Sequence, residues 1–355
     1  MQVERPDERR VVIMITSPLE QEHANRIAAV NPARIDLIYR PDLMPAMRYV
    51  GDHNGLLDWR RPDDQQSEWL ALLRRAEVLL DFDWRSGPPP FELSPHLKWV
   101  QTSSAGVGQT VKRLGLADSD LIVTTASGVH AGPLTEFVFG ALLYCVKDFP
   151  RLLADQATHH WDRFCSTELS GKTMAIIGPG RIGRQIARVA RAFEMTIWAM
   201  ARSNDPTRAA ELGVDRLFAR SELRTMLAGS DCLVISTPHT PDTENLIGAG
   251  EIAAIKPGSV LVNISRGVVL DEEALLEALK TGHIRFAALD VFRTEPLPPD
   301  SPLWDIPNLL INPHSASTAE SENGKIIDIF ARNLRHYLDG RYDLMSPVLD
   351  KQRLY

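Results

Sequence analysis

The stretch TMAIIGPGRIG, from Thr173 to Gly183, decides the fold of this chain. Its first six residues are those of a buried strand, and the QIARVARAF shortly after it has helical periodicity. A GxGxxG pattern between strand and helix suits a dinucleotide, because Gly178 permits the tight turn, Gly180 lets the backbone approach a pyrophosphate and Gly183 allows close helix packing. The free N–H groups and the positive dipole end of the helix then stabilise the phosphates. The turn therefore predicts a dinucleotide-binding unit.

Strand-like runs continue after this turn. They are short, apolar and rich in β-branched residues, and they alternate with helical stretches such as Asp271 to Thr281, which is typical of a parallel α/β sheet. Six such strands with crossover helices are the content of a Rossmann domain. The expected strands are Thr173 to Ile177, Met195 to Ala199, Cys232 to Ser236, Ser259 to Asn263, Phe286 to Val291 and Leu309 to Asn312.

A second series of strand-like runs precedes the turn, so the predicted fold class is α/β with two doubly wound parallel-sheet domains. The polar stretch from Gly51 to Ser67 interrupts this series and is interpreted as an insertion. Helical periodicity predicts one long connecting helix from Pro133 to about Ala154, and another helix from Thr318 to Leu338 that ends at Gly340. The strands expected in the first domain are Val11 to Ile15, Ile35 to Ile38, Val78 to Phe82, Lys98 to Gln101 and Leu121 to Thr124.

The composition of the chain excludes several classes of function. The 355 residues are enough for about two domains. With 44% hydrophobic and 24% charged residues, and no apolar run of the roughly 18 residues of a membrane span, a soluble globular protein is expected. The 39 Lys and Arg against 46 Asp and Glu leave a formal charge of -7 without a basic block, which argues against nucleic acid or a membrane as the partner. A small molecule is expected instead.

Cysteine and histidine usage indicates no metal and a reducing compartment. Cys145, Cys165 and Cys232 cannot all pair within the chain and form no CxxC spacing, so they are interpreted as small buried hydrophobes. The charged segment from Met1 to Arg10 lacks the apolar core of a secretory signal, and a cytoplasmic enzyme is expected. The adjacent pair His159–His160 lacks an HxxxH or HExxH spacing, so no metal site is expected.

Several spaced segments carry a more specific signal. They are SSAGV at Ser103 to Val107, ELSGKTMAIIGPGRIG at Glu168 to Gly183, TPHTPDTENLIG at Thr237 to Gly248, NISRG at Asn263 to Gly267, ALDVF with EPLP at Ala288 to Pro298, and SPLWDIPNLLINPHSA at Ser301 to Ala316. In this order they resemble the D-isomer-specific 2-hydroxyacid dehydrogenase family, in its glyoxylate/hydroxypyruvate reductase-like part. The matching segments extend over roughly two-thirds of the chain, and the residues before about 90 carry no matching motif.

The resemblance implies two domains, one of which is made of two separate segments of the sequence. A flavodoxin-like substrate domain would consist of residues 1–127 and 318–355, and a Rossmann dinucleotide-binding domain, 128–317, would be inserted between its parts. The active site would lie in the cleft, and a homodimer would form mainly through the dinucleotide domain. The pattern of strands agrees, because the helix after His314 and the closing tail have no role in a complete six-strand Rossmann sheet.

The resemblance also implies three catalytic residues. The family's arginine corresponds to Arg266 at the end of an expected strand, where a planar guanidinium can hold both the carboxylate and the carbonyl oxygen of a 2-oxo acid. Its general acid corresponds to His314, since reduction of a ketone needs a proton as the hydride reaches the carbon. Its partner carboxylate corresponds to Glu295, which would orient the imidazole ring and favour the charged form of the ring.

The family's other contacts fall on the substrate and the cofactor. The substrate carboxylate would be bound by backbone amides of Ser104, Ala105, Gly106 and Val107, whose small residues let the backbone approach an anion. Asp290 would accept a hydrogen bond from the nicotinamide carboxamide. The remaining cofactor-binding residues would be Gly178, Gly180, Arg181, Ile182, Gly183, Thr237, Pro238, Thr240, Ile264 and Ser265.

The residues after the second Rossmann strand indicate the cofactor. An NAD-binding unit places Asp or Glu about 20 residues beyond the glycines to accept from the ribose 2'-OH, but that position is Ala201. Arg202 and Ser203 follow and offer a charged fork and a hydroxyl to a 2'-phosphate, while Asp205 lies too far along the loop to replace the acid. NADP(H) is therefore the preferred cofactor and NAD(H) the alternative.

Three functions stay open at this point. The leading hypothesis is a D-specific, NAD(P)-dependent dehydrogenase or reductase of a small 2-oxo or 2-hydroxy acid. A relative acting on another small anion, as formate or phosphite dehydrogenases do, is the second, and a dinucleotide-sensing, corepressor-like binding protein is the third. The intact Arg266, Glu295 and His314 favour chemistry over sensing. Contacts that choose the substrate side chain are expected in the unmatched N-terminal region.

Overall fold

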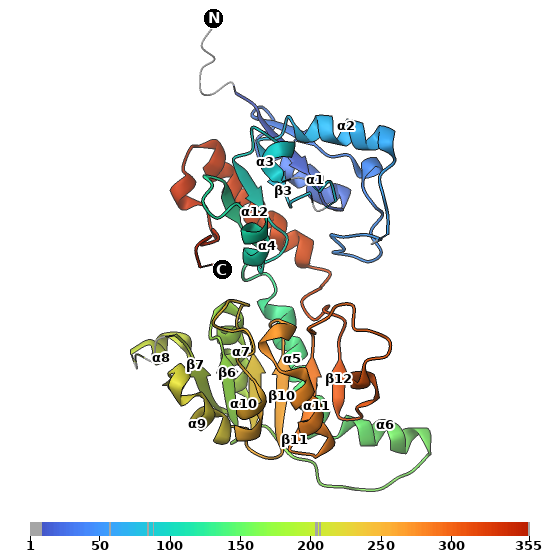
Figure 1. Ribbon diagram of the computed structural model, residues 1–355, viewed down its shortest axis with the longest axis vertical. Helices are drawn as coiled ribbons and strands as arrows, with labels where there is room; N and C mark the ends of the chain where they lie inside the picture. Colours follow the sequence, from blue (N-terminus) through green and yellow to red (C-terminus); the bar gives the residue numbers. More distant parts are fainter. Residues whose placement is uncertain are drawn as a thin grey trace, which may run out of the picture. The chain divides into compact units, whose positions relative to one another are not determined.

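The computed structural model describes residues 9–353 except 57, 84, 88, 203, 204 and 206. The described chain forms two compact units. Unit 2 is the continuous segment His130–Ser317, and unit 1 combines the described residues before it with those after it (Figure 1). Each unit is an α/β domain with its own parallel sheet, which confirms the predicted fold class.

Unit 1 is built on a five-stranded sheet. Its order is β2-β1-β3-β4-β5, so β1 lies between β2 and β3 and the chain winds outward from it in both directions. This is the doubly wound order of flavodoxin-like sheets. All five predicted runs are strands, with small differences at their ends. They are β1 (Val11–Ile15), β2 (Ile35–Ile38), β3 (Val78–Leu80), β4 (Trp99–Gln101) and β5 (Ile122–Thr124).

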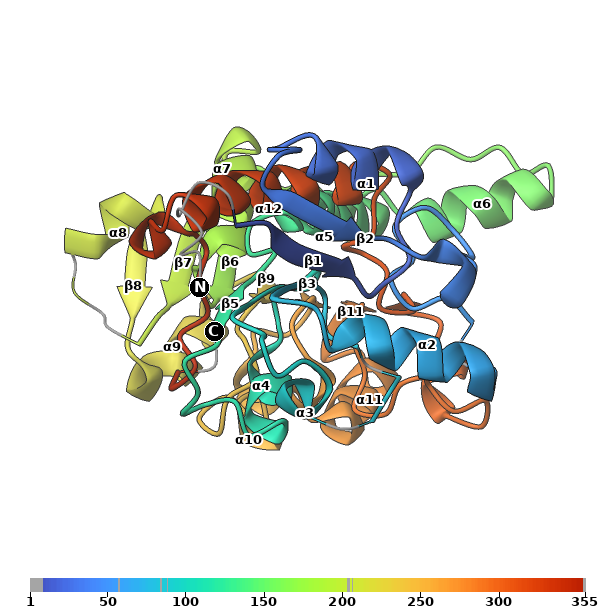
Figure 2. The ribbon, with the colours of Figure 1, turned by 90° about the horizontal axis from the view of Figure 1, so that it is seen from above.

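Helices cover both faces of this sheet, because successive side chains of a strand point to opposite sides. In β1, Ile13 and Ile15 pack against two helices on one face, whereas Met14 packs against three helices on the other. Figure 2 shows the sheet between these layers. The two helices are α1 (Gln21–Ala28) and α12 (Glu322–Leu338), and the three are α2 (Asp63–Leu73), α3 (Pro90–Leu93) and α4 (Gly108–Arg113).

The C-terminal segment completes the core of unit 1. The Trp99 ring stacks on Phe330 of α12 with ring centroids 4.9 Å apart, and its Nε1 donates to Thr124 Oγ1 at 2.7 Å. The tail then runs beside β5, where the Thr125 N–H donates to the Pro347 carbonyl at 3.0 Å. Residues from both ends of the chain therefore share one hydrophobic core.

Unit 2 is built on a seven-stranded parallel sheet of order β12-β11-β10-β9-β6-β7-β8. The six predicted strands are present, with small shifts at their ends. The seventh, β8, was not predicted, because its three residues begin with an exposed arginine and are too short to show an alternation. The strands are β6 (Thr173–Ile177), β7 (Thr196–Met200), β8 (Arg216–Phe218), β9 (Cys232–Ile235), β10 (Ser259–Asn263), β11 (Ile284–Leu289) and β12 (Leu309–Ile311).

Helices also cover both faces of this second sheet (Figure 1). Ile176 of β6 packs within the apolar cluster of one face, and Ile177 packs within the cluster of the other. The alternation explains why the run of apolar residues in β6 is continuous. The first face is covered by α5 (Ala131–Val146), α7 (Arg181–Ala192) and α8 (Thr207–Leu212), and the second by α9 (Leu223–Ala228), α10 (Ala249–Ala254) and α11 (Glu272–Lys280).

The single helix predicted from Pro133 to Ala154 is wrong, because the structure has two helices there. The first, α5, ends at Val146, and Asp148 then adopts a left-handed φ of 55° before α6 (Phe149–Ala157) begins. None of the residues of α6 is buried, and the helix protrudes from unit 2 (Figures 1 and 2). The break therefore turns the second helix away from the core.

Three smaller expectations also need correction. The segment from Gly51 to Ser67 lies outside the sheet as expected, but from Asp63 onward it is the beginning of α2. The last helix begins at Glu322 rather than at Thr318. Among the cysteines, all of which are free, Cys165 is exposed and only the other two are buried.

Two negative findings apply to the part of the chain that the structure describes. None of its helices combines the length and the apolar character that a membrane crossing requires. Within the same residues, no group of three or more His, Cys, Asp or Glu side chains is arranged to hold a metal ion.

Candidate active site

Apart from Ser203, which lies outside the described residues, every site residue predicted in unit 2 follows the carboxyl end of a parallel strand. Parallel strands bring these ends to one edge of the sheet, which is where open α/β sheets bind ligands. Gly178 follows β6, Arg202 follows β7 and Thr237 follows β9. Ile264 to Arg266 follow β10, Asp290 to Glu295 follow β11, and His314 follows β12.

The turn after β6 has the shape that a pyrophosphate needs. Gly178 has φ +89°, and a Cβ atom there would lie 2.8 Å from Thr237 Cα, so the turn requires glycine. A Cβ on Gly183 would lie 2.6 Å from the Gly178 carbonyl oxygen, which shows how closely α7 packs on the turn. Gly180 has no heavy atom within 4 Å of its Cβ position, so its backbone is open at the start of the 12-residue helix α7. These residues fit a dinucleotide phosphate.

The first turn of α7 carries one charged and one apolar side chain. Arg181 is exposed, whereas Ile182 packs against the hydrophobic core of unit 2. Their predicted contribution to cofactor binding is therefore through backbone N–H groups, together with the charge of Arg181.

The loop after β9 is tied to this glycine-rich turn. The Ser236 hydroxyl donates to the Gly178 carbonyl at 2.9 Å. Further along, the Thr243 hydroxyl donates to the Pro238 carbonyl at 2.7 Å and accepts from the Thr240 N–H at 2.8 Å. Side-chain hydrogen bonds thus hold this loop in one conformation beyond the end of β9. The predicted cofactor residues that it holds are Thr237, Pro238 and Thr240.

The loop after β7 carries the residues predicted to select the cofactor. Arg202 is exposed just beyond β7, and Ser203 lies outside the described residues. The Asp205 carboxylate accepts from the N–H and the hydroxyl of Thr207 at 2.9 and 2.8 Å, and these bonds lower the pKa of Asp205. Asp205 therefore caps the start of α8. Preference for NADP over NAD stays a prediction at this loop.

His314 and Glu295 form the central pair of the candidate site. His314 Nδ1 lies 2.7 Å from Glu295 Oε2, a geometry in which Nδ1 carries the proton that it donates to the carboxylate. The other oxygen, Oε1, accepts from the Phe292 N–H at 2.9 Å. Burial alone would raise the pKa of Glu295, but these two bonds outweigh burial and lower it. Glu295 is therefore a carboxylate that orients the imidazole ring.

Arg266 lies on the turn after β10, close enough to Glu295 and Asp290 for their charges to act on its guanidinium. Burial lowers the pKa of Arg266, while the charges of Glu295 and Asp290 act against this effect. An arginine still stays charged at neutral pH. The turn is shaped by Asn263, whose Oδ1 accepts from the N–H and the hydroxyl of Ser265 at 3.0 and 2.7 Å. Ile264, between them, is buried.

Asp290 holds the segment that carries His314. Its Oδ1 accepts from Asn312 Nδ2 at 2.6 Å and from the Ala316 N–H at 3.0 Å, and the side chain is buried. His314 between these two anchors has a left-handed φ of 53°, a conformation that persists only where the surroundings enforce it. The predicted contact of Asp290 with a carboxamide stays a prediction.

Two positioning residues of this site were missed from the sequence. Asn263 shapes the turn before Arg266, and Asn312 fixes the turn before His314. Both belong to the NISRG and NPHSA segments, so the signal was present in the motifs. Their role became apparent only from the bonds, because an asparagine after a strand is most often an ordinary turn residue.

The predicted carboxylate-binding loop of unit 1, Ser104–Val107, follows β4. The Ser104 carbonyl accepts from the Thr102 hydroxyl at 2.7 Å, and the Ser104 hydroxyl accepts from the Gly106 N–H at 3.2 Å. At its other end, the Val107 side chain is buried in the core. Ala105 and Gly106, between these anchors, are partly or fully exposed. The loop is therefore held at both ends with its backbone accessible.

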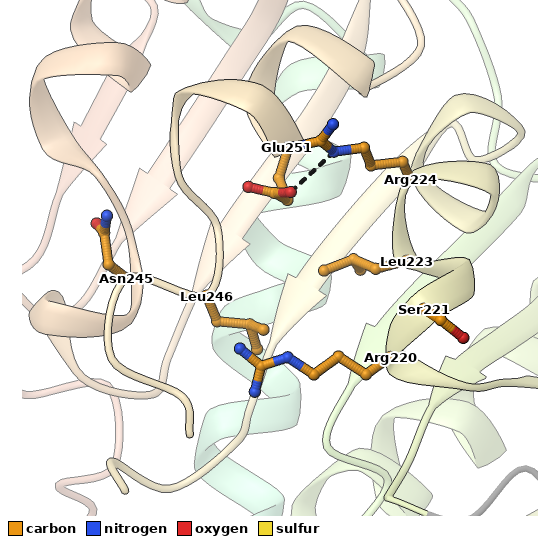
Figure 3. Close-up of a pocket in the computed structure, with 7 residues that line it drawn as sticks. All are labelled: Arg220, Ser221, Leu223, Arg224, Asn245, Leu246 and Glu251. Carbon is orange, nitrogen blue, oxygen red and sulfur yellow. Dashed lines mark hydrogen bonds and ion pairs between the residues drawn. The ribbon is translucent and has the colours of Figure 1, made fainter. Parts of the chain in front are cut away.

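A cavity of ≈ 410 Å³ in unit 2 is lined by none of the predicted site residues (Figure 3). Arg224 pairs there with Glu251 at 2.9 Å, and Arg220 donates to the Asp242 carbonyl. Because both guanidinium groups already bond to acceptors of the protein, we assign no ligand to this cavity. Its lining consists of Arg220, Ser221, Leu223, Arg224, Asn245, Leu246 and Glu251.

Comparison with known proteins agrees with this geometry. Residues 139–316 match a family described as D-isomer specific 2-hydroxyacid dehydrogenase, NAD binding domain. A D-3-phosphoglycerate dehydrogenase of Mycobacterium bovis is 36% identical over 276 residues, covering 77% of this chain and 50% of that protein. A D-3-phosphoglycerate dehydrogenase of Bacillus subtilis is 37% identical over 267 residues, covering 73% and 48%. The chain thus spans about half the length of these curated relatives.

Solved structures resemble the whole chain. A D-isomer specific 2-hydroxyacid dehydrogenase family protein from Aeromonas salmonicida has a TM-score of 0.78 and 29% identity, covering 96% of this chain and 99% of its own. A D-isomer specific 2-hydroxyacid dehydrogenase from Xanthobacter autotrophicus, in complex with NADPH and MES, has a TM-score of 0.76 and 26% identity, covering 98% and 100%. The family predicted from the spaced segments is therefore confirmed, and this chain belongs to the D-isomer specific 2-hydroxyacid dehydrogenases, a family of oxidoreductases.

Proposed function

We propose that this protein reduces a small 2-oxo acid to the D-2-hydroxy acid with NADPH. The observation that carries the proposal is the pair of His314 and Glu295, 2.7 Å apart beyond the strand ends of unit 2, with the charge of Arg266 acting on Glu295. An imidazole held by a carboxylate supplies a proton, and a guanidinium stabilises an oxyanion. Reduction of a carbonyl group to a hydroxyl group draws on both effects, a proton for the oxygen and stabilisation of the charge that develops on it.

The cofactor, Arg266, His314 and Glu295 each have one task in the proposed reaction. The nicotinamide cofactor, when bound, supplies the hydride. Arg266 binds the carboxylate and the carbonyl oxygen of the oxo acid and stabilises the negative charge that develops on that oxygen. His314 donates its proton to the same oxygen, and Glu295 stabilises the charged ring until the transfer. In the oxidation of a 2-hydroxy acid, His314 acts as the base.

Further residues bind without taking part in the chemistry. We assign the substrate carboxylate to the backbone amides of Ser104–Val107, and the pyrophosphate to the turn around Gly178 and Gly180. Arg202 supports NADPH over NADH, because a guanidinium binds a 2'-phosphate. The relative from Xanthobacter autotrophicus in complex with NADPH supports the same choice.

A second candidate is the oxidation of D-3-phosphoglycerate, and it is favoured by the names of the curated relatives. No specific observation favours a formate- or phosphite-type dehydrogenase. A corepressor-like sensor would not need the pair of Glu295 and His314 that the structure assembles.

An absorbance assay of reduced-cofactor consumption tests the proposal. Both NADPH and NADH are tested with glyoxylate, hydroxypyruvate, pyruvate, phenylpyruvate, 2-oxoisovalerate and 3-phosphohydroxypyruvate. Turnover of at least one unphosphorylated acid with NADPH is expected. Inactivity on the whole panel, while cofactor fluorescence still reports binding, would instead identify a sensor.

We also propose a cytoplasmic homodimer that associates through unit 2. The outer face of α6 carries Phe149, Leu152 and Leu153 at helical spacing, all exposed, and Trp161 beyond it is 94% exposed. Apolar side chains gathered on a protruding helix favour burial against a second copy. The three free cysteines accord with a reducing cytoplasm.

A further inference from the structure

The turn after β11 is held by two carboxylates, of which the proposed reaction uses only one. The Phe292 N–H donates to Glu295 Oε1 at 2.9 Å, and the next N–H along the chain, that of Arg293, donates to Glu272 Oε1 at 2.6 Å. Glu295 follows the two donors on the same turn, whereas Glu272 is the first residue of α11. Two successive N–H groups thus have acidic partners from two different segments, and the role of Glu272 calls for an explanation.

Capping of α11 does not explain Glu272. The cap is Asp271, whose Oδ1 accepts from the Ala274 N–H at 3.0 Å. The Glu272 carboxylate, one residue further on, makes its bond across to the turn after β11. The two acids at the start of this helix therefore have separate partners, and Asp271 serves as a control for Glu272.

The surroundings of Glu272 disfavour its charge. The residue is partly buried, and burial raises the pKa of Glu272. The N–H and the charge of Arg293 lower this pKa, but the negative charges of Glu295 and Asp271 raise it again, and the net shift is upward. A neutral side chain would avoid this electrostatic cost. An acid kept at an unfavourable position beside a reactive pair indicates a role other than stability.

A chain of hydrogen bonds leads from Glu272 to the proposed proton donor. The helix α11 is anchored by buried leucines in the core of unit 2, so its first residue has a fixed position. The first bond joins Glu272 to the backbone at Arg293, and the second joins the adjoining Phe292 N–H to Glu295. The third joins Glu295 Oε2 to His314 Nδ1 at 2.7 Å. A displacement of the turn would therefore displace the carboxylate that orients the ring.

We infer that Glu272 is a positioning residue, which holds the turn after β11 so that Glu295 keeps the His314 ring in place for proton transfer. Because its partner is a backbone N–H, Glu272 restrains the path of the chain itself and not one flexible side chain. The inference rests on the proposed function, since it takes His314 to be the proton donor. In this role Glu272 affects the rate of the chemical step and not the binding of substrate or cofactor.

Replacing Glu272 with Ala should lower the single-turnover rate of NADPH oxidation by about tenfold with the best oxo acid, because a shifted turn misplaces Glu295. Stopped flow measures this rate without interference from slow product release. KM for the oxo acid and for NADPH should stay within about twofold of the wild-type values, since the proposed binding contacts lie on other loops. An unchanged rate in Glu272→Ala overturns the inference.

The conservative variant identifies the hydrogen bond as the cause. Glu272→Gln keeps an oxygen that accepts from the Arg293 N–H and should restore the rate to within about threefold of the wild type. A Gln variant as slow as the Ala variant would show that this bond does not position the turn, which contradicts the inference.

Asp271→Ala separates positioning from loss of stability. It removes the cap of the same helix, so the melting temperature should fall at least as far as in Glu272→Ala. The single-turnover rate of Asp271→Ala should nevertheless stay within about twofold of the wild type. Equal losses of rate in the two Ala variants would show that Glu272 only supports α11, and the inference would then be wrong.

A double variant tests whether Glu272 acts through Glu295. In the background of Glu295→Gln, the further change Glu272→Ala should alter the rate by less than about twofold, because the carboxylate that Glu272 positions is already gone. Losses that multiply in the double variant would place Glu272 outside this chain of hydrogen bonds and overturn the inference.

A readout without turnover keeps the inference distinct from the proposed function. In protein with isotope-labelled histidine, the NMR signal of the His314 Cε1–H, assigned with His314→Gln, reports the surroundings of the ring. Its chemical shift should change in Glu272→Ala and keep the wild-type value in Asp271→Ala, and an unchanged shift in Glu272→Ala overturns the inference. If the wild type reduces no oxo acid and the signal still moves in Glu272→Ala, the proposed function fails while the positioning of the ring by Glu272 stands.

Discussion

A Cβ atom on Gly267 would lie 1.9 Å from the carbonyl carbon of Phe292. The turn that carries Arg266 is therefore in backbone contact with the segment that leads to Glu295. Since the Phe292 N–H also donates to Glu295, this contact joins the turn of Arg266 to the carboxylate that holds His314. The two segments can pack this closely because Gly267 has no side chain, and the arrangement of Arg266, Glu295 and His314 depends on this packing.

Replacing Gly267 with Ala should separate these segments and lower kcat/KM by about 100-fold, as expected when catalytic groups shift by about 1 Å. The melting temperature should also fall, because the clash is with backbone that cannot rotate away. Steady-state kinetics and calorimetry measure both effects. Gly140→Ala, at a helical position with nothing within 4 Å, is the control and should preserve both values. Wild-type activity in Gly267→Ala would refute the coupling.

Replacing His314 with Ala should lower kcat for reduction by at least about 100-fold while binding of the reduced cofactor is retained. In Glu295→Gln the ring loses the charged acceptor that orients it, so kcat for reduction should also fall while binding of the reduced cofactor is retained. Stopped-flow rates and fluorescence titration measure these effects. A wild-type kcat in Glu295→Gln would remove that residue from its role.

Protonation of Glu295 should also lower the free energy of unfolding in acid. Its folded-state pKa is lowered, so its carboxylate stabilises the fold above the ordinary value of 4.5, and this contribution is lost as the pH falls through the folded value. The difference in unfolding free energy between the wild type and Glu295→Gln should therefore be present at neutral pH and shrink in acid. Denaturant titrations at several pH values measure it, with the exposed Glu320→Gln as control. A difference that grows in acid would contradict the assignment.

Replacing Arg202 with Ala should lower kcat/KM for NADPH by more than about tenfold and hardly change that for NADH, as expected for a charge-assisted contact with a 2'-phosphate. The exposed Arg208→Ala, in the nearby helix α8, removes the same charge and should leave the ratio of the two cofactors unchanged. Equal or better efficiency of the wild type with NADH would show that the cofactor assignment is wrong.

Replacing Leu153 with Asp should weaken the homodimer, because it places a charge on the apolar face of α6. Sedimentation equilibrium should give twice the 39.6 kDa of one chain for the wild type and a lower average mass for the variant. Ala154→Asp adds the same charge toward the other face of the helix and should stay dimeric. A wild-type mass of a single chain would exclude the dimer.

The sequence predicted the strands better than the helices. A buried parallel strand is a continuous apolar run, and β6 and β10 were predicted to the residue for this reason. The short β8 offered only Leu217 and Phe218 as a signal and was missed. The break between α5 and α6 was missed because periodicity does not show a left-handed residue such as Asp148.

The candidate site was predictable where its residues are close in sequence to a strand end. Arg266 and His314 could be proposed in this way, and the structure adds the bonds that hold them. The approach of His53 to Glu322 was not predictable, since the two residues come from distant parts of the chain and neither belongs to a recognisable motif. Tertiary packing alone brings them together.

The stacking of Trp99 on Phe330 has a consequence for the order in which the protein is made. Unit 2 is one continuous segment and can fold as soon as it leaves the ribosome. The sheet of unit 1 is synthesised first, but the helix that covers one of its faces, α12, emerges only after all of unit 2. The first-made strands therefore complete their folding last, and the apolar side chains that α12 covers, Trp99 among them, stay uncovered until the end of synthesis.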